Sequence, residues 1–178
     1  ADSRSTTADA IRNGRKHHEL RQLCLETGVI DKDALGSSLV ELGHTKVLCQ
    51  VSLNFTHQDV SPDVGILDCK VQFAPHIGID ESLQRSRVVM PLDSMVSSGK
   101  LRSENMTRES SLSSQLHSAL VSVLRLEDFP KCALTIHVTI LQDDGSVLST
   151  CITAASLALA DARVEITDLV TSCTVAVV

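Results

Sequence analysis

The side chains able to do chemistry are scattered along this 178-residue sequence and form no recognisable catalytic motif. Six cysteines stand far apart without a CxxC pair, and the seven histidines show no zinc-ligand spacing. The sequence has no phosphate-binding glycine loop of the P-loop or dinucleotide type, and no HExxH or GxSxG motif. We therefore expect no resident metal ion and no cofactor.

Two further groups of polar residues could take part in chemistry. Asp143 and Asp144 could hold a metal ion, but their position directly before Gly145 is typical of a turn, which we favour. Residues 75–103 read as a long irregular stretch that carries several cations, and such loops are commonly functional or mobile. Their alternative role is that of an ordinary solvated linker. The cations in this stretch are Arg85, Arg87, Lys100 and Arg102, and Arg108 follows it.

Composition limits the ways in which this chain could bind nucleic acid. The net charge is −6, so binding through a globally basic surface is excluded and any contact with nucleic acid must be local. Aromatic residues make up 2% of the sequence, which removes the stacking platforms of autonomous single-strand RNA-binding modules. Most cysteines lie in apolar stretches, which favours buried thiols in a reducing, intracellular compartment.

Hydrophobic periodicity predicts the elements that must position these residues. Strands are expected from Leu20 to a turn at Gly28, in a hairpin about Gly43-His44, and over residues 66–74, together forming an antiparallel meander of about four strands. An amphipathic helix follows from Glu104 to the residues before Phe129-Pro130. A strand over 134–140, a helix rich in small residues over 149–162 and a strand over 167–178 complete the pattern. The prediction is an α+β fold with helices on one face of a mixed sheet.

Several segments resemble the ribonuclease PH family in order and spacing. They are RNGRKHHELRQLCLETGVI at 12–30, GSSLVELGHTKVLCQVS at 36–52, LQDDGS at 141–146, CITAASLALADA at 151–162 and DLVTSC at 168–173. The resemblance implies the ribosomal protein S5 domain 2-like fold over residues 12–178, possibly lacking its C-terminal portion, after a flexible tail at 1–11. The helix ending in ALADA followed by DLV looks most like exosome ring subunits of the kind that includes the mRNA transport regulator three subunit.

The resemblance also implies a site. Active members of the family attack the 3′ end of RNA with phosphate, which is held by two arginines and a glycine-rich turn while a carboxylate and Mg²⁺ assist. Arg108 matches one of these arginines, and Leu148 occupies the place of the second, where it cannot hydrogen-bond to phosphate. Arg163 also departs from the glycine that the family usually carries there. We therefore expect no catalytic residue, and a remnant phosphate site made of Arg108, Gly145 and Ser146.

These expectations favour a non-catalytic ring subunit of the RNA exosome that scaffolds the hexameric core and helps guide RNA during 3′-to-5′ processing and decay. In this interpretation the candidate RNA contacts are Arg85, Arg87, Lys100, Arg102 and Arg108, with ordinary solvent exposure as the alternative for each. The alternative is an active phosphorolytic 3′-to-5′ exoribonuclease. The resemblance implies as partners other ribonuclease PH-like subunits in a hetero-hexameric ring, S1/KH cap subunits, RNA and an associated exosome nuclease, with no membrane. It implies a location in the nucleus and nucleolus, and also in the cytoplasm.

Overall fold

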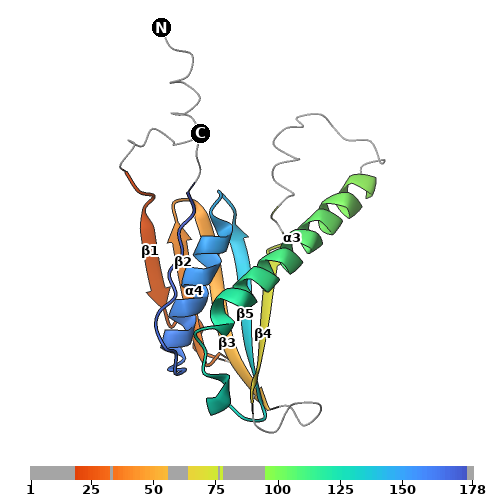
Figure 1. Ribbon diagram of the computed structural model, residues 1–178. Coiled ribbons are helices and arrows are strands. Elements are labelled where there is room, and N and C mark those ends of the chain that lie inside the picture. Colours follow the sequence, from red (N-terminus) through yellow and green to blue (C-terminus); the bar gives the residue numbers. More distant parts are fainter. Residues whose placement is uncertain (1–18, 33, 56–63, 76, 78–94, 176–178) are drawn as a thin grey trace.

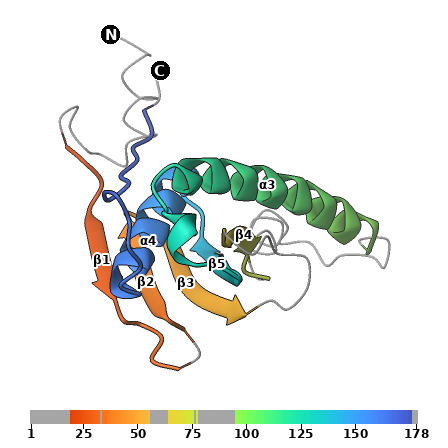
Figure 2. The same ribbon diagram turned by 60° about the horizontal axis from the view of Figure 1, so that its bottom comes forward.

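Alternating apolar residues build a mixed sheet that carries both long helices of the described residues on one face (Figures 1 and 2). The computed structural model describes residues 19–32, 34–55, 64–75, 77 and 95–175, and only the backbone of Phe55 and of residues 95–104. The predicted tail, residues 1–11, lies outside the described residues, as do Arg85 and Arg87.

The described strands form a single five-stranded sheet in the order β1-β2-β3-β5-β4. Their bounds are β1 Leu23–Thr27, β2 Gly36–Leu42, β3 Thr45–Phe55, β4 Ile66–Phe73 and β5 Cys132–Gln142. The hairpin between β2 and β3 is confirmed, and Gly43 turns the chain there at a φ of 63°, which glycine adopts at little cost. The predicted α+β class with a mixed sheet is confirmed.

The fourth predicted strand exists, but its expected place in an antiparallel meander was wrong. β4 lies at the far edge of the sheet and pairs in parallel with β5, from Ile66 opposite Ala133 to Phe73 opposite Ile140. A helix joins these two strands, and parallel neighbours require such a crossover connection. The strand–helix–strand order in the sequence was the signal that could have predicted the parallel pair.

Two long helices are described, α3 (Met95–Val121) and α4 (Val147–Asp161). α3 packs on β4 and α4 on β2 and β3, and Figure 2 shows both on the same side of the sheet. Residues 95–103 were expected to be irregular and are helical, since one interior glycine, Gly99, costs only about 1 kcal/mol in a long helix. The α-helix also ends earlier than predicted, and a 3₁₀ turn, Leu126–Asp128, follows.

The core lies between the sheet and the helices. Along β5 buried and half-buried residues alternate, with Ile136, Val138 and Ile140 fully buried, as the predicted period of two requires. The small residues of α4 allow it to approach β2 closely. A Cβ atom added to Gly36 would lie 2.3 Å from the backbone nitrogen of Ala162, so glycine is needed at this contact.

The last predicted strand was wrong for its described part, because residues 167–175 join no strand. A β-favouring sequence forms a strand only where a neighbouring strand can pair with it. This segment is attached instead to α4, where the Val170 N–H donates to Ser156 Oγ at 3.0 Å and the Thr174 hydroxyl donates to Ser149 Oγ at 3.2 Å.

The cysteines divide into two groups. Cys49, Cys69, Cys132 and Cys151 are buried as expected, whereas Cys24 and Cys173 are exposed, and all six are free thiols. Within the described residues, no helix is both long enough and apolar enough to cross a membrane.

Candidate functional site

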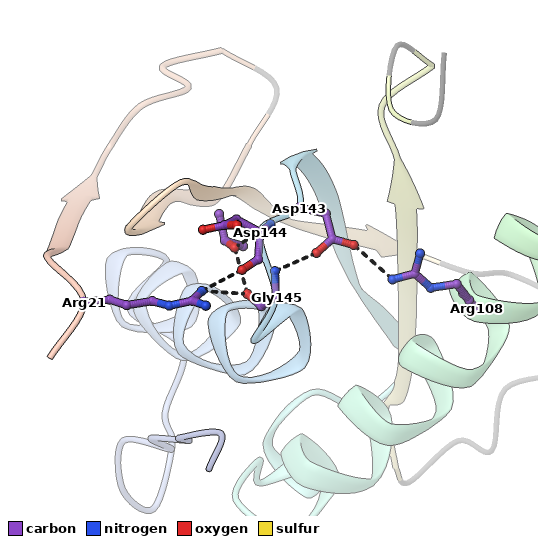
Figure 3. A network of polar contacts seen from close by, with 6 residues as sticks. Arg21, Arg108, Asp143, Asp144 and Gly145 are labelled. Atoms are coloured by element: carbon purple, nitrogen blue, oxygen red, sulfur yellow. Dashed lines mark hydrogen bonds and ion pairs between the residues drawn. The ribbon is translucent and has the colours of Figure 1, made fainter. Parts of the chain in front are cut away.

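The turn between β5 and α4 is the centre of a polar network (Figure 3). Asp143, the first residue after β5, accepts the N–H of Gly145 at Oδ1 (3.0 Å) and the Nη2 of Arg108 at Oδ2 (3.0 Å). Gly145 and Ser146 have φ values of 85° and 60°, which turn the backbone sharply into α4. The Asp143 carboxylate therefore accepts the hydrogen bonds from Arg108 and from the Gly145 N–H that an external anion bound at this turn would otherwise accept.

Arg108 reaches the turn from α3. Its guanidinium lies 4.9 Å from the centre of the Phe73 ring on β4, and its side chain is 55% exposed, against 20% for that of Asp143. The next residue, Glu109, accepts the N–H of Phe73 at 2.8 Å, which fixes this part of α3 against β4. Arg108 is thus oriented by an aromatic face and a carboxylate, and half of its surface faces solvent.

A second arginine approaches the turn from the opposite side, as Figure 3 shows. Arg21 donates from Nη1 to the carbonyl oxygens of Asp144 (2.8 Å) and Gly145 (3.4 Å). The buried hydroxyl of Thr45 donates to the Gly145 carbonyl at 2.7 Å and accepts the Asp144 N–H at 3.0 Å. Our sequence reasoning missed both residues, although Arg21 and the Gly-x-Thr at 43–45 stand within the segments that carry the family resemblance.

The first turn of α4 supplies no cationic side chain. Val147 is buried, and Leu148 is partly buried against the core. The Ser146 carbonyl accepts the N–H and the hydroxyl of Thr150, so Ser146 starts the helix through its backbone. An anion at this end of α4 would meet backbone N–H groups and an aliphatic side chain.

The Cys151 thiol, on α4, is unsuited to be a nucleophile. Burial, and after it the Asp143 carboxylate, raise the pKa of Cys151 to about 12. Burial also raises the pKa of Cys69 to about 12 and that of Cys49 still further. These thiols therefore remain protonated at neutral pH, and thiolates are the reactive form.

Comparison with known proteins identifies the family. A model of the 3′ exoribonuclease family, domain 1, matches residues 19–165, most of the chain. The chain belongs to the ribonuclease PH family. The fold is similar to that of the crystal structure of rice (Oryza sativa) Rrp46, with a TM-score of 0.64 at 19% identity over 89% of this chain and 64% of that one.

Relatives of this ribonuclease PH-type chain carry exosome names. It is 32% identical over 169 residues to the exosome complex component RRP41-like of Arabidopsis thaliana, covering 92% of this chain and 56% of that protein. It is 34% identical over 165 residues to the exosome complex component Rrp41 of Thermococcus onnurineus, covering 90% and 58%. The chain therefore spans a little over half the length of these relatives. The finer resemblance to the mRNA transport regulator three subunit stays a prediction.

The structure brings together part of the predicted site. Arg108 and Gly145 meet through Asp143, and Ser146 follows them at the start of α4. Lys100 and Arg102 belong to α3, in the part whose side chains are not described. Their contact with RNA stays a prediction, as does that of Arg85 and Arg87.

Proposed function

We propose that this chain is a non-catalytic ring subunit of an RNA exosome. Relatives at 31–34% identity that match about 90% of the chain are named exosome complex components, which supports a place in such an assembly. Within it the chain scaffolds a hetero-hexameric ring with other ribonuclease PH-like subunits. S1/KH cap subunits and an associated nuclease are the further partners in this proposal, and the nucleus, nucleolus and cytoplasm are its locations.

The observation that carries the non-catalytic role is the occupation of the anion site by Asp143. Both of its carboxylate oxygens are engaged, one with Arg108 and one with the Gly145 N–H. Phosphate bound here would compete with a carboxylate that is already held in place, and would meet its negative charge. Leu148 adds no compensating cation. Phosphorolysis requires dense positive charge, because the attacking phosphate and the RNA backbone repel each other.

The contribution to RNA guidance rests on local cations. The chain as a whole is acidic, so an RNA path needs positive residues concentrated along it. In this proposal Arg85, Arg87, Lys100, Arg102 and Arg108 line that path. The half-exposed side chain of Arg108 is consistent with a weak contact to a phosphate group.

An active phosphorolytic exoribonuclease is the second candidate. Arg108 favours it, because this arginine is retained beside the β5–α4 turn and its side chain is partly exposed to solvent. A partner subunit could then supply the missing arginine across an interface. Leu148 argues against activity of the chain alone, because leucine cannot replace the second phosphate-binding arginine.

The test is phosphate-dependent degradation of a 3′-tailed RNA, with released nucleoside diphosphate as the readout. The chain is assayed alone and with the ring subunits of its organism, as wild type and as Arg108→Ala, with Arg163→Ala as a control at an exposed arginine away from the turn. We expect ring assembly with all three forms and no diphosphate release that depends on Arg108. Diphosphate release that Arg108→Ala abolishes and Arg163→Ala preserves would establish the active enzyme instead.

A further inference from the structure

β1 is an edge strand whose outer side has no partner in the described part of the chain (Figures 1 and 2). Two hydrogen bonds bracket its pairing with β2, from the Gly43 N–H to the Gln22 carbonyl (2.8 Å) and from the Gly28 N–H to the Ser37 carbonyl (2.9 Å). Bonded and non-bonded positions alternate in an antiparallel pair, so every second residue between these bonds directs its N–H and C=O away from β2. Those residues are Leu23, Leu25 and Thr27.

The opposite edge of the sheet, β4, differs from β1 because a helix accepts hydrogen bonds from its outward-facing N–H groups. On β4 the N–H of Val71 donates to Ser113 Oγ at 3.0 Å, and the N–H of Phe73 donates to Glu109 Oε1 at 2.8 Å. Both acceptors are side chains of α3, which covers β4. At one edge the fold therefore satisfies two outer N–H groups with its own helix, whereas within the described residues nothing pairs with the outer N–H groups of β1.

The side chains of β1 suit a protein contact better than exposure to water. Leu23 is 54% and Leu25 47% exposed, and both lie on the α4 side of the sheet, since Leu25 stands opposite the buried Val40. Edge strands that remain exposed are usually protected by lysine, proline or a bulge. β1 reads LCLET and contains neither lysine nor proline, so its only charge is Glu26, on the other face.

We propose that β1 is a strand-addition edge that receives an extended strand from a neighbouring subunit of the ring, and this proposal rests on the proposed function. The backbone groups of Leu23, Leu25 and Thr27 require a strand as the occupant, because only an extended backbone presents donors and acceptors at the matching repeat. The incoming strand carries apolar side chains at alternate positions, which cover Leu23 and Leu25. On its other face it presents no carboxylate beside Glu26, where like charges would repel.

Hydrogen exchange tests the backbone part of this proposal. The chain is co-expressed with the ring subunits of its organism, and amide exchange is compared between the free chain and the purified assembly. We expect the amides of Leu23, Leu25 and Thr27 to exchange quickly in the free chain and slowly in the assembly. Those of Cys24 and Glu26, which face β2, are protected in both forms and serve as internal controls.

A pair of variants at one position separates the backbone donor from the side chain. Leu25→Pro removes an outward N–H that β2 does not use, and proline is tolerated at such edge positions. Leu25→Val keeps both the N–H and an apolar side chain. We expect Leu25→Pro to weaken assembly roughly tenfold or more, because a carbonyl of the incoming strand would be buried without its N–H donor. Leu25→Val should change assembly little. Leu23→Pro, at the first residue of the strand, repeats the test if Leu25→Pro proves unstable as a free chain.

The possible outcomes separate this proposal from the proposed function. If wild type assembles but the three outward amides exchange as fast as in the free chain, and the proline variants assemble normally, the strand-addition edge is refuted and ring membership stands. If wild type does not assemble with ring subunits, both proposals fail. Self-association of the chain that Leu25→Pro abolishes, without binding to ring subunits, would make a second copy the occupant and overturn the neighbour.

Discussion

Replacing Asp143 with alanine tests whether this carboxylate is the resident anion of the β5–α4 turn. The change removes one ion pair, to Arg108, and one acceptor, for the Gly145 N–H. An ion pair with an exposed partner contributes at most about 1 kcal/mol, and Arg108 is 55% exposed. A hydrogen bond from an amide to a charged carboxylate contributes about 1.5–3 kcal/mol. We therefore expect the free energy of unfolding to fall by about 2–3 kcal/mol, which lowers Tm by about 4–12 °C for a chain of this length.

The matched control is Asp144→Ala. It makes the same change in net charge at the neighbouring residue, but Asp144 is exposed and enters the network through its backbone N–H and carbonyl. Its effect on the free energy of unfolding should stay within about 0.5 kcal/mol. Urea unfolding of wild type and both variants provides the measurement. Equal destabilisation by the two variants would refute the role assigned to Asp143.

The same variant predicts a response to phosphate. With the Asp143 carboxylate gone, Arg108 and the Gly145 N–H are free to bind an external anion. Inorganic phosphate at ten times its Kd would then stabilise the variant by about 1.4 kcal/mol. Phosphate should raise the Tm of Asp143→Ala more than that of wild type or of Asp144→Ala at equal ionic strength. An identical response of all three proteins would show that Asp143 does not occupy an anion site.

Three further predictions concern the fold. Gly36→Ala should destabilise by about 1–3 kcal/mol or more, because its Cβ would meet the backbone of α4, whereas the exposed Leu35→Ala should cost less than about 1 kcal/mol in urea unfolding. Ile136→Ala, at a fully buried position of β5, should cost about 2–5 kcal/mol in the same assay. The raised pKa values of Cys69 and Cys151 predict that stability is retained below pH 9, where both states keep the proton, and falls as pH rises from 9 toward 12, by up to about 1.4 kcal/mol per pH unit for each thiol. Unfolding at pH 8 and pH 10 checks this, and replacing both thiols with alanine should reduce the dependence to the part that Cys49, whose pKa burial also raises, contributes.

The sequence by itself determined the local elements and the family. Alternating residues predicted β1, the β2–β3 hairpin and β5, because side chains on successive strand residues point to opposite faces. The small residues of the second helix predicted close packing, which Gly36 and α4 confirm. The segments at 12–30, 36–52 and 141–162 were sufficient to indicate the ribonuclease PH family. Leu148 stands where the family resemblance places an arginine, so the absence of this cation follows from residue type alone.

Tertiary structure alone decided the contacts between segments far apart in the chain. Arg108 and Asp143 come from α3 and the β5–α4 turn, and Arg21 lies 123 residues before the carbonyl to which it donates. Nothing in the local pattern specifies such pairs, since each depends on how the sheet orders its strands. The same holds for β4, which local alternation identified as a strand but could not place beside β5. Periodicity reports which face of an element is buried, whereas strand order and open edges follow from how all the elements cover one another.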